Sequence, residues 1–226
     1  MTVAAVVPAA GRGQRLGGVV PKAFRQLGGA PLVVHAVRSL LASPYVGLVV
    51  VAVPADRVGE LPKLVAGPVL AVPGGASRQD SVAAALAVLP SEVDVVLVHD
   101  AARPLVPVSV VDAVAAAVLA GAPAAVPVLP MVDTLKRVDA AGLVTATLPR
   151  EPIRAVQTPQ GFRREVLAAA HAAAGVAAAA TDDAGLVERL GIAVHTVPGA
   201  AEALKITLPF DLLVAEAILR VRGHVG

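Results

Sequence analysis

Cysteine is absent from the 226 residues, tryptophan is absent as well, and aromatic residues make up only 2% of the chain. Without cysteine there can be no disulfide framework, thiol nucleophile or cysteine-ligated zinc site. This absence is compatible with a reducing cytoplasm, where we expect the protein to reside. The shortage of aromatic residues argues against stacking platforms for single-stranded nucleic acid and leaves alanine, valine and leucine to build the core.

Charge is also scarce. Charged residues account for 16% of the chain, and 19 Lys and Arg against 17 Asp and Glu give a formal net charge of +2. No cluster of Lys and Arg forms a nucleic-acid-binding surface, so no nucleic-acid partner is expected. The 56% hydrophobic content excludes general disorder. Basic residues stand singly, several beside glycine or proline, which suits a phosphate-binding pocket.

One long uncharged run, residues 113–132, has the length of a membrane span. One glycine and three prolines interrupt it, so we interpret it as a buried helix followed by a buried strand. The apolar segment Thr2–Pro8 has no preceding basic region and does not resemble a signal peptide. We therefore expect no association with a membrane.

Continuous valine-rich runs alternate with stretches of helical length. Such runs are typical of strands buried on both faces of a parallel sheet. The alternation predicts one domain over residues 1–226, an α/β fold with a doubly wound, mostly parallel sheet flanked by helices. The expected strands are Val3–Val7, Leu48–Val53, Val69–Val72, Val93–Val98 and Ala124–Val128, and the expected helices are Leu32–Leu41, Ser77–Leu89 and Val108–Ala120.

The pattern changes after Met131. Two short segments around a turn predict a β-hairpin arm at about residues 132–157. Three more helices and one strand are expected beyond it, with Thr181 as an N-cap. The ranges are Thr134–Val138 and Leu143–Leu148 for the hairpin, Phe162–Ala174, Asp182–Leu190 and Pro209–Val221 for the helices, and Ala193–Val197 for the strand.

A glycine-rich loop, Pro8–Gly17, follows the first strand. Gly11 and Gly13 let backbone N–H groups approach phosphate oxygens, and Arg15 and Lys22 add mobile positive charge. An ordinary strand-to-helix turn would have the same composition. The loop matches neither a Walker phosphate loop nor a dinucleotide-binding fingerprint.

The third predicted strand ends in a second glycine-rich loop, residues 74–81. Arg78 and Ser81 offer hydrogen-bond donors to a ligand there. Ser77 can also cap the following helix, and the two roles are compatible.

The fourth predicted strand ends in His99-Asp100, with Arg103 close behind. Asp100 is a natural ligand for Mg²⁺, which prefers one or two carboxylates together with phosphate oxygens. Arg103 would hold a phosphate or pair with Asp100. His99 is expected to pack and hydrogen-bond within the sheet, and Lys205, in an apolar setting, to point into a cleft rather than lie solvated on the surface.

Together these segments resemble the 2-C-methyl-D-erythritol 4-phosphate cytidylyltransferases. The resemblance covers nearly the whole chain and keeps the same order. It is carried by Val7-Pro8-Ala9-Ala10-Gly11-x-Gly13-x-Arg15, Pro21-Lys22, Gly74-Gly75-x-x-Arg78-x-x-Ser81-Val82, Val98-His99-Asp100-Ala101-Ala102-Arg103-Pro104, Val132-Asp133-Thr134-Leu135-Lys136, Thr158-Pro159-Gln160-x-Phe162, Thr181-Asp182-Asp183-Ala184 and Lys205-Ile206-Thr207.

The resemblance implies a Rossmann-like nucleotidyltransferase that joins CTP to 2-C-methyl-D-erythritol 4-phosphate in non-mevalonate isoprenoid synthesis and releases pyrophosphate. It implies Arg15, Lys22 and Lys205 as catalytic residues, and Asp100 as the ligand of Mg²⁺, with Mn²⁺ as an alternative. The implied CTP-binding residues are Pro8, Ala9, Ala10, Gly11, Gly13, Gly75, Ala76, Arg78 and Ser81.

The same resemblance implies that the sugar-alcohol phosphate is bound by Asp100 and Arg103, with Thr134, Arg150 and Thr158 reaching into a neighbouring subunit from the arm. The functional unit would then be a homodimer. Ala76 stands where the family often has Asp, and the surroundings of Arg150 and Lys205 also depart from the usual pattern.

Three alternatives stay open from the sequence. A ribitol-5-phosphate cytidylyltransferase would share the fold and much of the CTP loop, and a related enzyme would use another nucleotide, such as UTP. A nucleotide-binding regulator without catalysis is the alternative from a different class. In-line attack by a phosphate oxygen needs charge neutralisation rather than a general base, which agrees with the lack of a Ser–His–Asp set.

Overall fold

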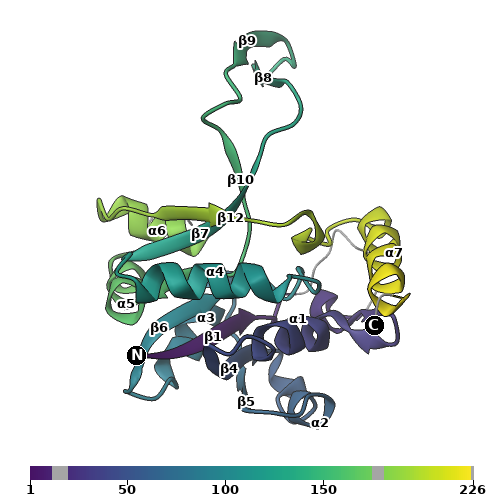
Figure 1. The fold of residues 1–226 in the computed structure, drawn as a ribbon, viewed down its shortest axis with the longest axis vertical. Coiled ribbons are helices and arrows are strands. Elements are labelled where there is room, and N and C mark those ends of the chain that lie inside the picture. The colour runs from purple at the N-terminus through teal and green to yellow at the C-terminus, as the bar shows by residue number, and fades with distance from the viewer. Residues whose placement is uncertain (12–19, 175–180, 225–226) are drawn as a thin grey trace.

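The centre of the computed structural model is a twisted sheet with strand order β10-β7-β11-β6-β1-β4-β5 and with β12 paired to β7 (Figure 1). The structure describes residues 1–11, 20–174 and 181–224. The pairs β1–β4, β1–β6, β4–β5 and β7–β12 are parallel, whereas β10 and β11 run antiparallel to their neighbours. The strands are β1 (Thr2–Pro8), β4 (Val46–Val53), β5 (Val69–Pro73), β6 (Val93–Val98), β7 (Ala124–Pro130), β10 (Arg154–Val156), β11 (Gln160–Arg163) and β12 (His195–Pro198).

Helices cover both faces of this sheet, because its strands are apolar on both sides. Along β1, Val3, Ala5 and Val7 belong to the core that includes residues of α1 (Leu32–Leu41) and α4 (Val108–Leu119). Ala4 and Val6 belong to the core with α3 (Arg78–Ala87), α5 (Arg164–Ala173) and α6 (Asp183–Arg189). The period of two in β1 therefore divides its side chains between the two layers.

Two smaller elements complete the body. Helix α2 (Leu61–Leu64) adds Leu61 to the first core, and α7 (Pro209–His224) packs on a third apolar cluster that includes Leu27 and Leu32. Strands β2 (Gln26–Leu27) and β3 (Ala30–Pro31) form a short hairpin, and β2 contacts α7. The short elements α2, β2 and β3 were not expected from the sequence.

The predicted doubly wound α/β architecture is confirmed. All five early strands and three early helices form within a few residues of their expected bounds. The uncharged run at residues 113–132 is the end of α4 followed by β7. Among the described residues, no helix is both long enough and apolar enough to cross a membrane.

Two local expectations are wrong. Phe162 does not begin a helix, since β11 inserts between β6 and β7 and α5 starts two residues later, at Arg164. The N-cap of α6 is Asp182 rather than Thr181, because the Asp182 carboxylate accepts a hydrogen bond from the N–H of Gly185 at 3.0 Å.

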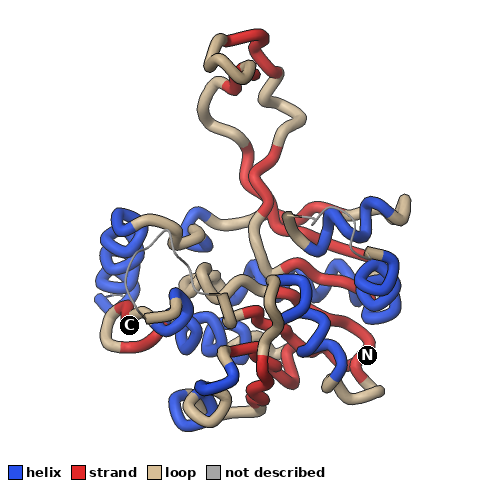
Figure 2. The backbone as a smooth tube through the Cα atoms, turned by 180° about the vertical axis from the view of Figure 1, so that it is seen from behind, coloured by secondary structure: helices blue, strands red, loops and turns tan. Residues whose placement is uncertain are grey.

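The β-hairpin arm stands out from the body (Figures 1 and 2). Its tip is the hairpin of β8 (Leu135–Val138) and β9 (Val144–Leu148), in which Leu135 pairs with Leu148. The carboxylate of Asp139 closes the turn by accepting from two backbone N–H groups. The arm as a whole exposes apolar side chains, with Val132 80% and Leu143 66% accessible.

Candidate active site

The predicted site residues of the body gather at the carboxyl ends of β1, β5 and β6, where open α/β sheets bind ligands. Two hollows lie there, and Pro8 and Gly11 line both of them. The larger, about 540 Å³, is lined by Pro8, Ala10, Gly11, Gly75, Ala76, Ser77, Arg78 and Ser81. The smaller, about 160 Å³, is lined by Pro8, Ala9, Gly11, Lys22, Ala23, Asp100, Ala101, Ala102 and Lys205.

A third hollow of about 350 Å³ lies at the opposite, amino end of β6. Val93, Asp94 and Arg164 are among the residues that line it, and none of the predicted site residues does. The sequence-derived site and the carboxyl-end hollows therefore coincide, while the hollow at the amino end has no part in them.

The two glycine-rich loops touch each other. A Cβ atom at Gly74 would lie 2.4 Å from the Cβ of Ala10, closer than real contacts allow. A Cβ at Gly75 would lie 2.2 Å from the Cβ of Asp80. Glycine is thus required at both positions for the second loop to fit between the first loop and helix α3.

The second loop is held by its own side chains. Ser77 and Asp80 form a capping box at the start of α3. The buried Ser81 hydroxyl donates to the carbonyl of Ser77 at 2.9 Å and accepts from the N–H of Gly75 at 3.2 Å. The predicted capping role of Ser77 is confirmed, and Ser81 shapes the loop that lines the larger hollow.

Asp100 lies between two cations. Lys205 Nζ is 2.7 Å from Asp100 Oδ2, and Arg78 Nε is 3.3 Å from Asp100 Oδ1. Burial raises the pKa of Asp100, but the charges of Arg78 and Lys205 outweigh it and hold that pKa well below its usual range. Asp100 is therefore ionised at neutral pH, and Lys205 lines the smaller hollow.

Arg103 does not pair with Asp100. Its guanidinium donates to the carbonyls of Ala203 at 2.7 Å and Val156 at 3.3 Å. Its buried Nε has no hydrogen-bond partner within the described residues. Of the two interpretations of the sequence, pairing with Asp100 is therefore wrong, and phosphate binding by Arg103 stays a prediction.

His99 and Thr158 support Asp100 from within the sheet. The fully buried His99 bonds through Nε2 to the Arg103 carbonyl at 3.1 Å and through Nδ1 to the Thr158 hydroxyl at 3.0 Å. Burial lowers the pKa of His99 to about 4, so the ring is neutral near pH 7. The Thr158 hydroxyl in turn accepts from the N–H of Asp100 at 3.0 Å.

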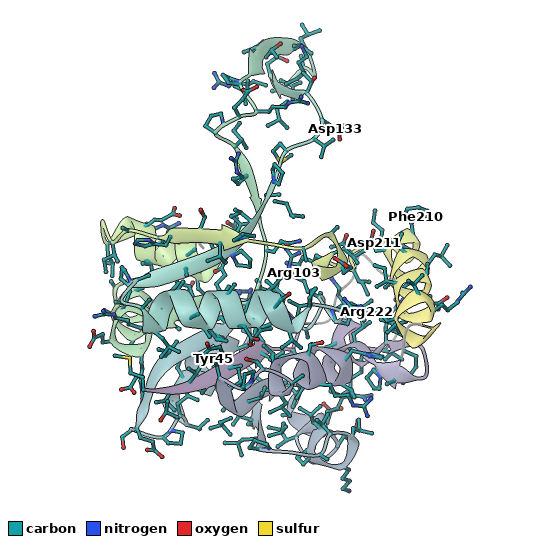
Figure 3. The ribbon with its side chains drawn as sticks, in the orientation of Figure 1. Tyr45, Arg103, Asp133, Phe210, Asp211 and Arg222 are labelled. Carbon is teal, nitrogen blue, oxygen red and sulfur yellow. The ribbon has the colours of Figure 1, made fainter. Side chains whose placement is uncertain are left out.

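The expected position of Thr158 on the arm is wrong. Thr158 is buried beneath Asp100 of its own subunit. Thr134 and Arg150 do lie on the arm, where both are exposed, and Arg150 donates to the carbonyl of Val132 across it. Figure 3 shows this separation, with Arg103 in the body and Asp133 far out on the arm. Gly13 and Arg15 lie outside the described residues.

Comparisons with known proteins agree with the resemblance seen in the sequence. A profile of the IspD family, 2-C-methyl-D-erythritol 4-phosphate cytidylyltransferase, matches residues 3–221. The chain belongs to this family. A curated member from Frankia casuarinae is 58% identical over 217 residues, covering 96% of this chain and 81% of that protein. Another, from Saccharopolyspora erythraea, is 57% identical over 227 residues, covering 97% of this chain and 100% of that one.

A solved structure gives the same result. The 2-C-methyl-D-erythritol 4-phosphate cytidylyltransferase from Thermus thermophilus is 41% identical, with a TM-score of 0.83. The match covers 97% of this chain and 100% of that one. Sequence and fold therefore agree on the cytidylyltransferase family.

The donors present fit one kind of magnesium site. No group of three or more His, Cys, Asp or Glu side chains suited to a metal ion occurs in the described parts of the chain, so a cage of protein ligands is not formed there. Asp100 supplies one ionised carboxylate beside the hollows, and Mg²⁺ often takes one or two carboxylates and completes its shell with phosphate oxygens and water. This donor chemistry is compatible with a magnesium ion that takes most of its ligands from a nucleotide triphosphate, once Asp100 gives up a contact with Lys205 or Arg78.

Sequence reasoning missed two residues of this cytidylyltransferase site. Asp183 bonds Arg78, and His171 bonds Asp183. Asp183 was in a segment that carries the family resemblance, but its neighbours in sequence gave it no role beyond the start of a helix. Its partner Arg78 is 105 residues away, so only the fold brings them together.

Proposed function

We propose that this chain transfers the cytidylyl group of CTP to 2-C-methyl-D-erythritol 4-phosphate and releases pyrophosphate. The observation that carries the proposal is the pair of hollows that share Pro8 and Gly11, with Asp100 and Lys205 in the lining of the smaller one. Two phosphate-bearing substrates can meet there, one from each hollow. Family membership supplies the identity of the two substrates.

CTP fits the larger hollow. Backbone at Ala10, Gly75 and Ala76, which line this hollow, would hold the cytosine together with backbone at Ala9, which lines the adjoining one. The close loop contacts leave N–H and carbonyl groups as the main recognition elements. The triphosphate would lie along the loop after β1 toward Lys22, which lines the adjoining hollow. The family resemblance adds Gly13 and Arg15 to the residues that are proposed to act on the triphosphate.

The acceptor phosphate fits the smaller hollow, close to Lys205 and Arg103. One of its oxygens attacks the α-phosphorus of CTP, the new oxygen–phosphorus bond forms, and the bond from that phosphorus to the β-phosphate oxygen breaks. The electron pair leaves with pyrophosphate. The attacking phosphate is already ionised near neutral pH, so no general base is needed.

The residues around the reacting phosphates act by charge and position. Lys22, Lys205 and Arg103 would neutralise the approaching anions and align them. His99 is no base in this scheme, because both ring nitrogens are bonded and the side chain is buried. Magnesium, held by Asp100 and the triphosphate, would supply further charge neutralisation, with Mn²⁺ as an alternative.

The working unit is proposed to be a homodimer in the cytoplasm, where the lack of cysteine suits a reducing environment. The arm exposes Val132, Leu143 and Val144, and an apolar surface of this kind is typical of an interface. Thr134 and Arg150 on the arm would then reach the acceptor pocket of the other subunit. Sedimentation of the intact chain against an arm variant with Leu143→Ser and Val144→Ser tests this, since a monomeric wild type contradicts it.

The acceptor is tested by pyrophosphate release with CTP and Mg²⁺, comparing 2-C-methyl-D-erythritol 4-phosphate with ribitol 5-phosphate. Turnover with the first alone supports the proposal. Turnover with only the second would support the same mechanism with ribitol 5-phosphate as the acceptor. Faster turnover with UTP than with CTP would indicate that UTP is the nucleotide substrate. Thermal stabilisation by CTP without turnover on either acceptor would indicate a non-catalytic binder.

Lys22→Ala is expected to lower turnover by roughly 10²–10³, by analogy with the loss of one preorganised electrostatic donor. The effect should fall on kcat more than on the melting temperature. Activity within tenfold of wild type would contradict the role of Lys22.

A further inference from the structure

Asp183 is a buried carboxylate behind the wall of the larger hollow. It opens helix α6, and its side chain is 1% exposed. One oxygen accepts from Arg78 Nη1 at 2.6 Å, and the other lies 2.8 Å from His171 Nε2. His171 is itself buried on α5, with 7% of its side chain exposed.

Arg78 is held at two points of its guanidinium group. Nη1 meets Asp183 at 2.6 Å, and Nε meets Asp100 at the longer distance of 3.3 Å. Nη2 has no acceptor among the described residues, and the side chain lines the larger hollow. The shorter contact of Arg78 is therefore with Asp183, and the longer one is with Asp100, the proposed ligand of the metal.

An arginine beside a single carboxylate normally forms a bidentate pair. Such a pair with Asp100 would place two guanidinium nitrogens on the carboxylate that is proposed to hold the metal. Here Asp183 takes Nη1 instead, so Nε is the nitrogen of Arg78 that contacts Asp100. His171 contacts the second oxygen of Asp183 and so orients the carboxylate, with its first oxygen toward Arg78.

We propose that Asp183, supported by His171, is a positioning residue that keeps the guanidinium of Arg78 in the nucleotide hollow and limits its contact with Asp100 to the single nitrogen Nε. This inference rests on the proposed function, because Arg78 lines the hollow that is assigned to CTP and the family resemblance implies that it binds CTP. Burial raises the pKa of Asp183, but the hydrogen bond from His171 and the charge of Arg78 outweigh it and hold that pKa below its usual range, so the carboxylate is charged.

The decisive variant is Asp183→Asn, with Asp182→Asn as the matched control. Asp182 is one residue away and also carries a carboxylate, but it bonds Gln160 and the N–H of Gly185 rather than Arg78. Asparagine is as good an N-cap as aspartate, so the control removes the same charge from the same turn without undoing the helix.

The first readout is CTP affinity by calorimetry at one saturating Mg²⁺ concentration and without acceptor. Loss of one charge-assisted contact predicts about tenfold weaker binding for Asp183→Asn and an unchanged value for Asp182→Asn. The second readout is the Mg²⁺ concentration for half-maximal turnover, which should rise several-fold only in Asp183→Asn. Equal CTP affinity in wild type and a folded Asp183→Asn protein overturns the proposal, as does an equal loss in the control.

A double-variant cycle separates positioning from general loosening. Arg78→Gln removes the group that Asp183 positions, so adding Asp183→Asn should weaken CTP binding little further. Full additivity of the two effects would overturn the proposal. If Asp183→Asn does not fold, His171→Gln serves instead. We expect it to weaken CTP binding by less than Asp183→Asn would, and an unchanged CTP affinity would overturn the proposal. Because the calorimetry needs no turnover, it stays informative if the acceptor proposal fails.

Discussion

The buried histidine behind Asp100 gives stability a defined pH dependence. His99 donates from Nε2 to the carbonyl of Arg103, which leaves Nδ1 to accept from the Thr158 hydroxyl. Only the neutral ring with its proton on Nε2 satisfies both bonds. Protonation of Nδ1 would remove that acceptor and place a charge in a fully buried position.

The size of the effect follows from the pKa of His99. Burial lowers it from 6.5 to about 4 in the folded protein. Between these values the unfolded chain binds more protons than the folded one, so the free energy of unfolding rises with pH and the contribution is complete above about pH 6.5. The interval of about 2.5 pH units, at about 1.4 kcal/mol each, amounts to about 3.5 kcal/mol in full, of which about 3 kcal/mol is lost on acidification from pH 7 to pH 4.

Urea unfolding of wild type and His99→Gln between pH 4 and 7 measures this contribution. The glutamine amide can donate to the Arg103 carbonyl and accept from Thr158, but it does not titrate. Other acids and histidines titrate in both proteins and cancel in the difference. The wild-type advantage should grow by about 3 kcal/mol from pH 4 to pH 7. Parallel curves would refute the assignment of a buried neutral ring.

Two further predictions concern the hollows. Lys205→Met removes the cation 2.7 Å from Asp100 and should lower turnover roughly 10²–10³. Lys63→Met, on an exposed position of α2, is the control, and a loss of less than tenfold in steady-state pyrophosphate release would speak against a catalytic Lys205. Gly75→Ala should cost about 1–3 kcal/mol in urea unfolding and weaken CTP binding, because its Cβ has no space. Gly59→Ala, where a Cβ meets nothing within 4 Å, should leave CTP binding intact; equal effects of the two would contradict the packing argument.

The parallel part of the fold could be predicted because its sequence signal is local. Val93–Val98 is a continuous apolar run apart from Asp94, and it forms β6 with those bounds. Strands β10 and β11 gave no such signal, since they are short and contain Arg154 or Gln160 among few apolar residues. What makes β11 a strand is its place between β6 and β7, where Phe162 becomes fully buried.

The site could be predicted only in part, for a similar reason. Loop glycines and a polar residue at a strand end are visible in the sequence, and Asp100 and Gly75 lie where such reasoning puts them. Ion pairing is decided by the fold. The sequence offered Arg103 as a partner for Asp100 because the two are close in the chain, yet Arg78 and Lys205 have that place.

The charges of the side chains also bear on why a metal ion should be needed. Asp100 and Asp183 carry two negative charges, and Arg78 and Lys205 carry two positive ones, so these four ion-paired groups sum to zero before any substrate arrives. A triphosphate and an acceptor phosphate together bring several negative charges to the same place. Among the described residues Lys22 and Arg103 add two positive charges, and Arg15 adds a third through the family resemblance, which is fewer than the phosphates bring, so further positive charge accompanying the nucleotide would help to neutralise them. A magnesium ion held by Asp100 together with the triphosphate would supply such charge, and Lys205 would then be available to the phosphates.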